Sequence, residues 1–214
     1  WNTRKVQTMA AMFHRARAFN RDIGNWDTSS VISMNLIFKT TGGGMAFNKD
    51  IGNWDTSKVT TLASAFETSN GDTTKFDHNI REWDTSQVTT MTRMFYKATN
   101  FDNGGNHLNM WDTSNVQVMA QMFYGAAEFN QYVGGWDTSQ VTTMSGMFRE
   151  ASTFASDIGG WDTSQATSLE SMFRDATQFG RTSIKQWNVS QVTTFADMWQ
   201  GSAFSNNLCK RQEV

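Results

Sequence analysis

The sequence predicts an α/β repeat solenoid of eight stacked coils, similar to a leucine-rich repeat, with one short strand and one short helix or 3-10 segment in each coil. Three observations predict this fold class: tryptophan recurs at a nearly constant spacing, six copies open with the letters WDTS, and the chain has no proline. A period of about 25 residues is typical of solenoids, because such a short unit buries its apolar side chains only against its neighbours. Proline would interrupt a hydrogen-bonded ladder between coils.

The copies are separated by 25 to 29 residues and share the pattern WDTSxVTxMxxMFxxAxxFNxxIGx. They begin at Trp1, Trp26, Trp54, Trp83, Trp111, Trp136, Trp161 and Trp187. We treat residues 1–214 as a single repeat domain. Because the chain opens with WNTRKV, without an initiator methionine or an apolar leader, we also expect it to be a fragment of a longer chain.

Each copy contains an apolar stripe followed by an arc rich in β-branched and aromatic residues. In the first copy Met9, Met12, Phe13 and Ala16 are spaced as i, i+3, i+4 and i+7, which predicts a two-turn helix or a 3-10 segment. The arc IGxWDTSxVT predicts one short parallel strand, and its glycine predicts a tight corner. Coils spaced like hydrogen-bonded strands would form a rod or shallow arc about 40 Å long.

This repeat resembles that of the BspA-like leucine-rich-repeat surface proteins, especially the branch in Mycoplasma surface lipoproteins, and similar arrays in protists and viruses. The resemblance extends from Trp1 to about Leu208. It implies a non-catalytic array displayed outside the cell or at its surface and used for adhesion or protein interaction. The end copies depart from the pattern, with Asn2 and Asn188 in place of aspartate.

Composition argues against several partners. The net charge is -2 and the pI is about 5.9, so the basic excess of a nucleic-acid binder is missing. No apolar run approaches the roughly 20 residues needed for a bilayer span, which argues against direct membrane insertion. The single cysteine, Cys209, excludes an internal disulfide and an all-cysteine metal cage.

The aspartate of WDTS recurs in six copies, and two interpretations are open. Stacked carboxylates repel one another, which would favour calcium between the coils. Alternatively, each aspartate accepts a hydrogen bond from the N–H two residues on, and asparagine does the same in the end copies. We favour this Asx turn and expect no metal site. The residues concerned are Asp27, Asp55, Asp84, Asp112, Asp137 and Asp162.

The threonine of WDTS forms a second polar column. Regular threonine rows on a flat face bind ice or crystalline polysaccharide, whereas threonines that bond along the stack have a structural role. The residues concerned are Thr28, Thr56, Thr85, Thr113, Thr138 and Thr163. Because His14, His78 and His107 fall at different points of the repeat, we expect neither catalysis nor a cofactor.

Three successive copies carry extra residues, at 40–45, 70–75 and 103–107. Insertions in solenoids map to loops on one face, which is often the binding face. The candidate partner contacts are Met45, Lys75, His107 and Met110. Our main hypothesis is therefore a structural or interaction module that binds another protein or a glycan, and the alternative is a Thr/Ser-face binder of ice or crystalline polysaccharide.

The end copies keep apolar residues where capping repeats usually carry polar ones, which indicates end-to-end stacking or assembly into a larger complex. Asn188 also begins an Asn-Val-Ser triplet, but the same asparagine fills the predicted Asx-turn position. Whether it carries a sugar is left open.

Overall fold

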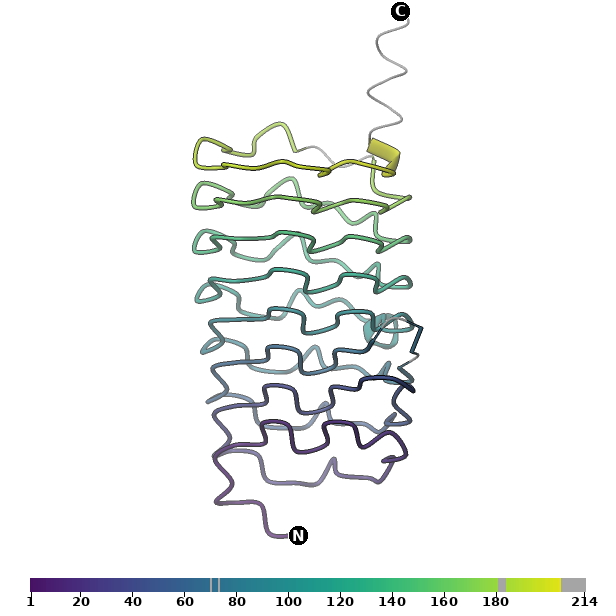
Figure 1. Cartoon of the computed structure of the whole chain (residues 1–214). Helices are drawn as coiled ribbons and strands as arrows, with labels where there is room; N and C mark the ends of the chain where they lie inside the picture. Colours follow the sequence, from purple (N-terminus) through teal and green to yellow (C-terminus); the bar gives the residue numbers. More distant parts are fainter. Residues whose placement is uncertain (70, 73, 181–183, 205–214) are drawn as a thin grey trace, which may run out of the picture.

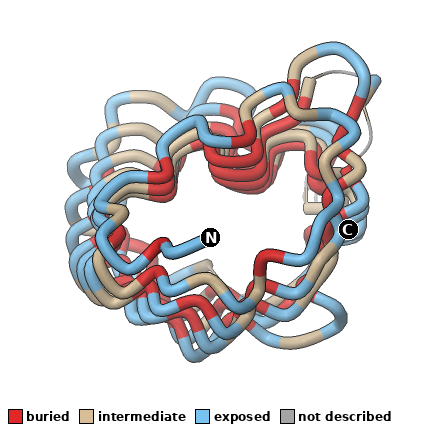
Figure 2. The backbone as a smooth tube through the Cα atoms, turned by 90° about the horizontal axis from the view of Figure 1, so that it is seen from below, coloured by how far each residue is buried: buried red, intermediate tan, exposed pale blue. Residues whose placement is uncertain are grey.

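The computed structural model describes residues 1–69, 71–72, 74–180 and 184–204. The chain winds into closed coils that are stacked one on another from the N-terminus upward (Figure 1). Seen along the stack, buried positions line the inside of each coil and exposed positions its outside (Figure 2). The predicted solenoid of stacked, periodic coils is therefore confirmed.

Regular secondary structure is sparse. Within the described ranges the one complete helix is the 3-10 helix η1 (Asn103–Gly105), although Ala203 and Phe204, at the end of the last range, are also helical. The same ranges contain isolated parallel bridges and no named strand. The expected strand is thus reduced to a series of single bridging residues one position after the predicted arc, with one further bridge between Met45 and Thr74. The series is Thr8, Ser33, Thr61, Thr90, Val118, Thr143, Ser168 and Thr194.

The predicted helix in each coil is wrong, because its residues form consecutive turns. In the fifth copy the N–H groups of Met122, Tyr124 and Ala126 donate to the carbonyl oxygens three residues before them, at 3.1–3.2 Å. Gln121, the third residue of the first turn, has φ 56°, as a type II turn requires. A left-handed residue at this point stops the chain from continuing as a helix. We call this segment, residues 119–126 and its equivalents, the turn ribbon.

The other N–H groups of the turn ribbon point along the stack. Met119, Gln121, Phe123 and Gly125 donate to carbonyl oxygens of residues 143–149 in the sixth copy, at 2.7–3.2 Å. Alternate N–H groups thus close turns and join coils, so the backbone polar groups are paired without either a helix or a regular strand.

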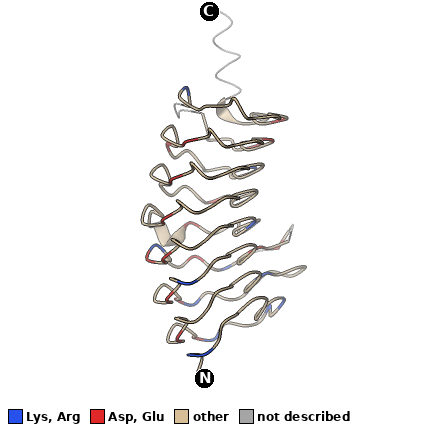
Figure 3. Cartoon of the chain, turned by 90° about the vertical axis from the view of Figure 1, so that its left-hand side faces the viewer, with Lys and Arg blue, Asp and Glu red and all other residues tan. Residues whose placement is uncertain are grey.

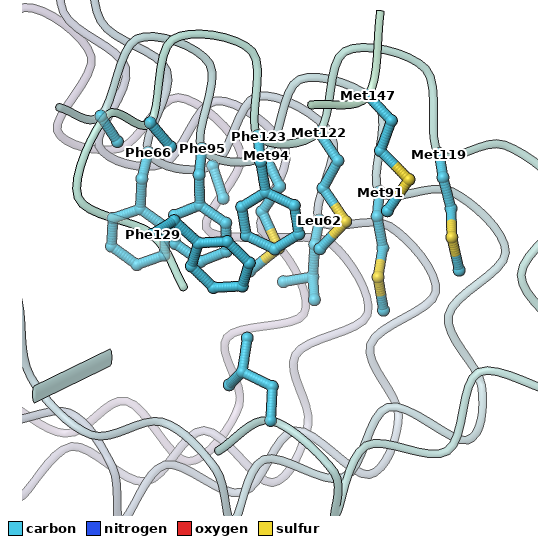
Figure 4. Close-up of a cluster of buried hydrophobic side chains, with 14 of the residues drawn as sticks. Leu62, Phe66, Met91, Met94, Phe95, Met119, Met122, Phe123, Phe129 and Met147 are labelled. Atoms are coloured by element: carbon cyan, nitrogen blue, oxygen red, sulfur yellow. The ribbon is translucent and has the colours of Figure 1, made fainter. Parts of the chain in front are cut away.

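Aromatic side chains fill the coils as stacked columns. The first Phe column, which ends in Trp199, has centroid spacings of 5.2–5.9 Å between copies. The second Phe column has spacings of 5.8–6.2 Å. The methionine columns lie beside the phenylalanines (Figure 4), and Met119, Met122, Phe123 and Phe129 are completely buried. Burial of this repeated apolar set is the main force that holds the coils together.

The tryptophan column contributes both its aromatic rings and its indole N–H groups to the contacts between coils. Trp136 is 3% exposed, and its Nε1 donates to the carbonyl oxygen of Leu108 at 2.9 Å. The equivalent hydrogen bond joins five other tryptophans to a carbonyl oxygen of the preceding coil, at 3.0–3.3 Å: Trp54, Trp83, Trp111, Trp161 and Trp187. Each bond satisfies a buried donor, which explains why tryptophan rather than phenylalanine occupies this column.

Candidate interaction surface

The WDTS corner forms the predicted Asx turn. In every copy Oδ1 of the aspartate or asparagine accepts a hydrogen bond from the N–H two residues on, at 2.8–3.3 Å. Asn2 and Asn188 make this bond without a charge, as expected for the end copies. Acidic residues recur from coil to coil along one edge of the stack (Figure 3). Their role at this edge is to fix the corner after each tryptophan.

Hydrogen bonds at this corner lower the pKa of several aspartates from the ordinary value of 3.8. The main cause is the serine hydroxyl for Asp27, Asp55 and Asp112, and the serine N–H for Asp162. A lowered pKa means that the folded chain favours the carboxylate.

The contribution of these carboxylates to stability is therefore present above their unfolded pKa and is lost as the pH falls through the folded values. We expect the urea midpoint to drop as the pH is lowered below about 4. A variant with Asp27→Asn, Asp55→Asn, Asp112→Asn and Asp162→Asn should show a smaller drop. Equal drops in the two proteins would contradict this assignment.

The WDTS threonines do not supply a binding face for ice or polysaccharide. All six are 1–2% exposed, and each hydroxyl donates to the carbonyl oxygen of the Asp or Asn in the next copy at 2.7–3.0 Å. Exposed threonines do occur, one position after the valine of the repeat, but Thr142 and Thr167 donate their hydroxyls to the preceding copy at 3.2 and 3.0 Å. The threonine hydroxyls therefore act mainly along the stack.

The first two insertions lie side by side. Met45 and Thr74 form a parallel bridge, and the N–H of Lys75 donates to the carbonyl oxygen of Met45 at 3.3 Å. Lys75 is exposed, as a contact residue must be. Met45 is only 3% exposed and belongs to the core, so it does not fit the expectation of a partner contact. Its side chain is part of the same buried cluster as the repeat columns.

The third insertion lies at a different point of the coil. It follows the second Phe column and contains η1, whose Gly104 N–H donates to Asp77 Oδ1 at 2.9 Å. His107 is exposed, and its Nδ1 lies 3.0 Å from Gln131 Oε1. Met110, directly before Trp111, is 55% exposed. The expectation of one loop face therefore holds only for the first two insertions.

A second polar surface, which no pattern in the sequence indicates, runs along the turn ribbon of copies two to seven. We call it the tyrosine–arginine row. It consists of Lys39, Glu67, Arg93, Tyr96, Lys97, Tyr124, Arg149, Glu150 and Arg174. The rings of Tyr96 and Tyr124 stack at 4.7 Å, and the guanidinium of Arg93 lies 4.1 Å from the Tyr96 ring centre. The tyrosine stack, together with the ion pair of Arg93 and Glu67 at 3.4 Å, links neighbouring copies through side chains that the repeat pattern leaves free to vary.

Glu150 is the centre of this row. It accepts hydrogen bonds from Lys97 Nζ and from the Tyr124 hydroxyl, the latter at 2.7 Å. Burial alone raises the pKa of Glu150, but these two hydrogen bonds and the charges of Lys97 and Arg149 together outweigh burial and lower it. Burial and the bond to Glu150 raise the pKa of Tyr124 to about 12. Glu150 is thus held between the Lys97 amino group and the Tyr124 hydroxyl.

Four other features of the sequence concern metal, membrane, cysteine and sugar. Within the described ranges, no group of three or more His, Cys, Asp or Glu side chains is placed to hold a metal ion. No helix in those ranges has the length and apolar character needed to cross a membrane. Cys209 lies outside the described residues. Asn188 is exposed and fills its Asx turn, which does not test glycosylation.

Stacked coils joined by backbone bonds and aromatic columns define the class of protein as a repeat solenoid. The chain belongs to the family described as Mycoplasma protein of unknown function, DUF285, whose model matches it twice, over residues 1–104 and 103–211. In further comparisons, no curated protein and no solved structure matches the chain.

Proposed function

We propose that this protein is a non-catalytic interaction module of a surface or scaffold protein, and that it binds another protein through the tyrosine–arginine row. The observation that supports this proposal is how variable residues are distributed. The core columns of the repeat keep nearly the same residue type in every copy. By contrast, the position after each first-column aromatic holds His14, Lys39, Glu67, Tyr96, Tyr124, Arg149, Arg174 and Gln200.

The chemistry of the row suits a protein partner. Tyrosine and arginine are, with tryptophan, the residue types enriched at binding hot spots. The side chains of Arg93 and Arg149 are 36% and 30% exposed, so part of each is accessible, although the Nε atom of each is buried. Contact with Tyr96 and Tyr124 holds them in place before binding, which lowers the entropy lost on association.

The resemblance to BspA-like leucine-rich-repeat proteins supports placing such a module outside the cell or at its surface, and we include that location in the proposal. The repeat then acts as a rigid support whose coils set the spacing of the contact residues. Binding through charged residues should also be faster at low than at high ionic strength.

The test compares capture of partners from the native source by three variants. The first, Arg93→Ala with Arg149→Ala, removes two row contacts but leaves Glu67 paired with Lys39 and Glu150 paired with Lys97. The second, Lys75→Ala with His107→Ala and Met110→Ala, removes the three exposed residues that the sequence suggested as partner contacts. The third, a control at the WDTS corner, is Gln140→Ala with Gln165→Ala, both exposed.

We expect a partner that the unaltered chain and the control capture equally and that the row variant captures at least about tenfold less, a loss typical of a hot spot. Thermal melts should show that all three variants fold. Loss in the insertion variant alone would move the binding site to the loops. Equal capture by all variants would overturn the proposed row.

A further inference from the structure

The tyrosine–arginine row has a surplus of positive charge in copies two to six. The turn ribbon of these copies contains four basic and two acidic residues, whereas the rest of the chain contains 14 basic and 18 acidic ones. Each of the two glutamates lies within ion-pair distance of two basic side chains, so one positive charge in each group is not neutralised. The groups are Glu67 with Lys39 and Arg93, and Glu150 with Lys97 and Arg149.

The part of the row in copy seven is different. There Arg174 lies within ion-pair distance of both Asp175 and Asp197, and its Nη1 donates a hydrogen bond to Asp197 at 2.8 Å. The charge of this arginine is therefore more than neutralised by its own neighbours. The positive surplus is confined to the two groups in copies two to six.

The guanidinium groups of Arg93 and Arg149 have unused hydrogen-bonding capacity. Neither donates a hydrogen bond to an acceptor among the described residues, and their ion pairs with Glu67 and Glu150 measure 3.4 and 3.5 Å. The Nε atom of each is buried without a partner, which leaves the Nη atoms as donors for an incoming group. A carboxylate matches the planar arrangement of these donors and supplies the opposite charge.

Both arginines are held against tyrosine rings. The guanidinium carbon of Arg93 lies 4.1 Å from the Tyr96 ring centre, and that of Arg149 lies 5.0 Å from the Tyr124 ring centre. The two rings stack on each other at 4.7 Å. Because the arginines belong to copies four and six, they lie about 10 Å apart along the stack. The site therefore consists of two positioned cations linked by a pair of aromatic rings.

We infer that the partner presents an acidic protein segment to the row, with carboxylates that accept hydrogen bonds from Arg93 and Arg149. Such a segment neutralises the positive surplus, and two carboxylates about 10 Å apart engage both arginines. A long polyanion, such as nucleic acid or a sulfated glycan, would also meet the acidic remainder of the chain, which repels it. The inference rests on the row as the proposed binding site and adds the chemistry of its partner.

The probe is a blocked peptide of about eight glutamates, which spans about 26 Å when extended and so reaches both arginines. Titration calorimetry at low ionic strength measures its binding to the unaltered chain and to three variants. Arg93→Gln with Arg149→Gln removes two charges from the row, and Arg93→Lys with Arg149→Lys keeps them. Lys5→Gln with Lys58→Gln removes the same charge from the WDTS corner, where both lysines are exposed. Melting curves check that all variants fold.

We expect the unaltered chain and the corner control to bind the glutamate peptide equally, and the glutamine variant to bind it at least about tenfold more weakly. The lysine variant should lie between them, because lysine keeps the charge but not the planar donors. No binding by the unaltered chain, or equal binding by the glutamine variant, would overturn the inference. So would tighter binding of a lysine peptide or of a sulfated oligosaccharide of equal charge.

Capture of partners from the native source separates this inference from the proposed function. If a partner is captured through the row but the glutamate peptide does not displace it, the inference fails and the proposed function stands. If the variant with both arginines replaced captures every partner as the unaltered chain does, the proposed function fails as well.

Discussion

Replacing Phe123 with alanine should lower the free energy of unfolding by about 3–5 kcal/mol. Phe123 is completely buried, and its ring centre lies 3.8 Å from that of Phe129 in the same copy. It also stacks on Phe95 and Phe148 in the adjacent copies, at 5.5 and 5.7 Å. The substitution would open a cavity at the junction of two columns, and rings held from both sides cannot move far enough to fill it.

Urea unfolding followed by tryptophan fluorescence measures this loss. The control is Tyr132→Ala, because Tyr132 is also aromatic but is 43% exposed. Its replacement should cost less than about 1 kcal/mol, as is usual for a surface side chain. Similar losses of unfolding free energy in the two variants would contradict the claim that the aromatic columns are the main stabilising feature of the stack.

Replacing Gly134 with alanine should cost about 1–3 kcal/mol through overpacking. A Cβ atom at this position would overlap the backbone carbonyl oxygen of Asp157 in the next copy, and a backbone atom cannot rotate away. Gly24 and Gly52 approach the next copy in the same way, with Cβ to carbonyl distances of 2.7 and 2.6 Å. The glycine that predicted a tight corner is therefore needed for close contact between coils.

Gly135 provides the matched control. A Cβ atom there would have one neighbour within 4 Å, Tyr132 Cε1 at 3.9 Å, and neither glycine has a left-handed φ. Gly135→Ala should change the free energy of unfolding, measured by urea titration, by no more than about 0.5 kcal/mol. If both alanine variants are equally stable, the coils are not in close contact at Gly134.

The apolar columns could be predicted because the same apolar residue types recur at the same positions in every copy. The Asx turns could be predicted because Asp and Asn side chains both accept a hydrogen bond from the backbone N–H two residues on. The turns in place of a helix were not predicted, because Met9, Met12, Phe13 and Ala16 have a spacing that both structures satisfy. The feature that distinguishes the turns from a helix is a residue with left-handed φ. Ala11 and Leu36 have φ of 55° and 61°, but their residue types do not indicate a left-handed conformation. The available signal was glycine: Gly146 occupies this same position, and Gly125 and Gly201 occupy a second left-handed position four residues further on, and all three have positive φ.

The tyrosine–arginine row could not be predicted in the same way. Its residues differ from copy to copy, so no column of the pattern draws attention to them. Lys97 and Glu150 come from the fourth and sixth copies, and only the stacking of coils brings them together. The insertions, which are visible as added length, were easier to recognise, but length alone did not reveal that Met45 is buried.

The central claim, that each repeat is one coil in register with the next, is tested most directly by engineered disulfides in a Cys209→Ser background. Thr142, Thr167 and Thr193 are exposed equivalents in three successive copies, joined by N–H to carbonyl bonds of 2.8–2.9 Å. Adjacent coils lie about 5 Å apart, within reach of a disulfide, and alternate coils about 10 Å apart, beyond it. Thr142→Cys with Thr167→Cys should therefore cross-link on mild oxidation, and Thr142→Cys with Thr193→Cys should not. Cross-linking of the distant pair, or of neither pair, would contradict the stacked-coil structure.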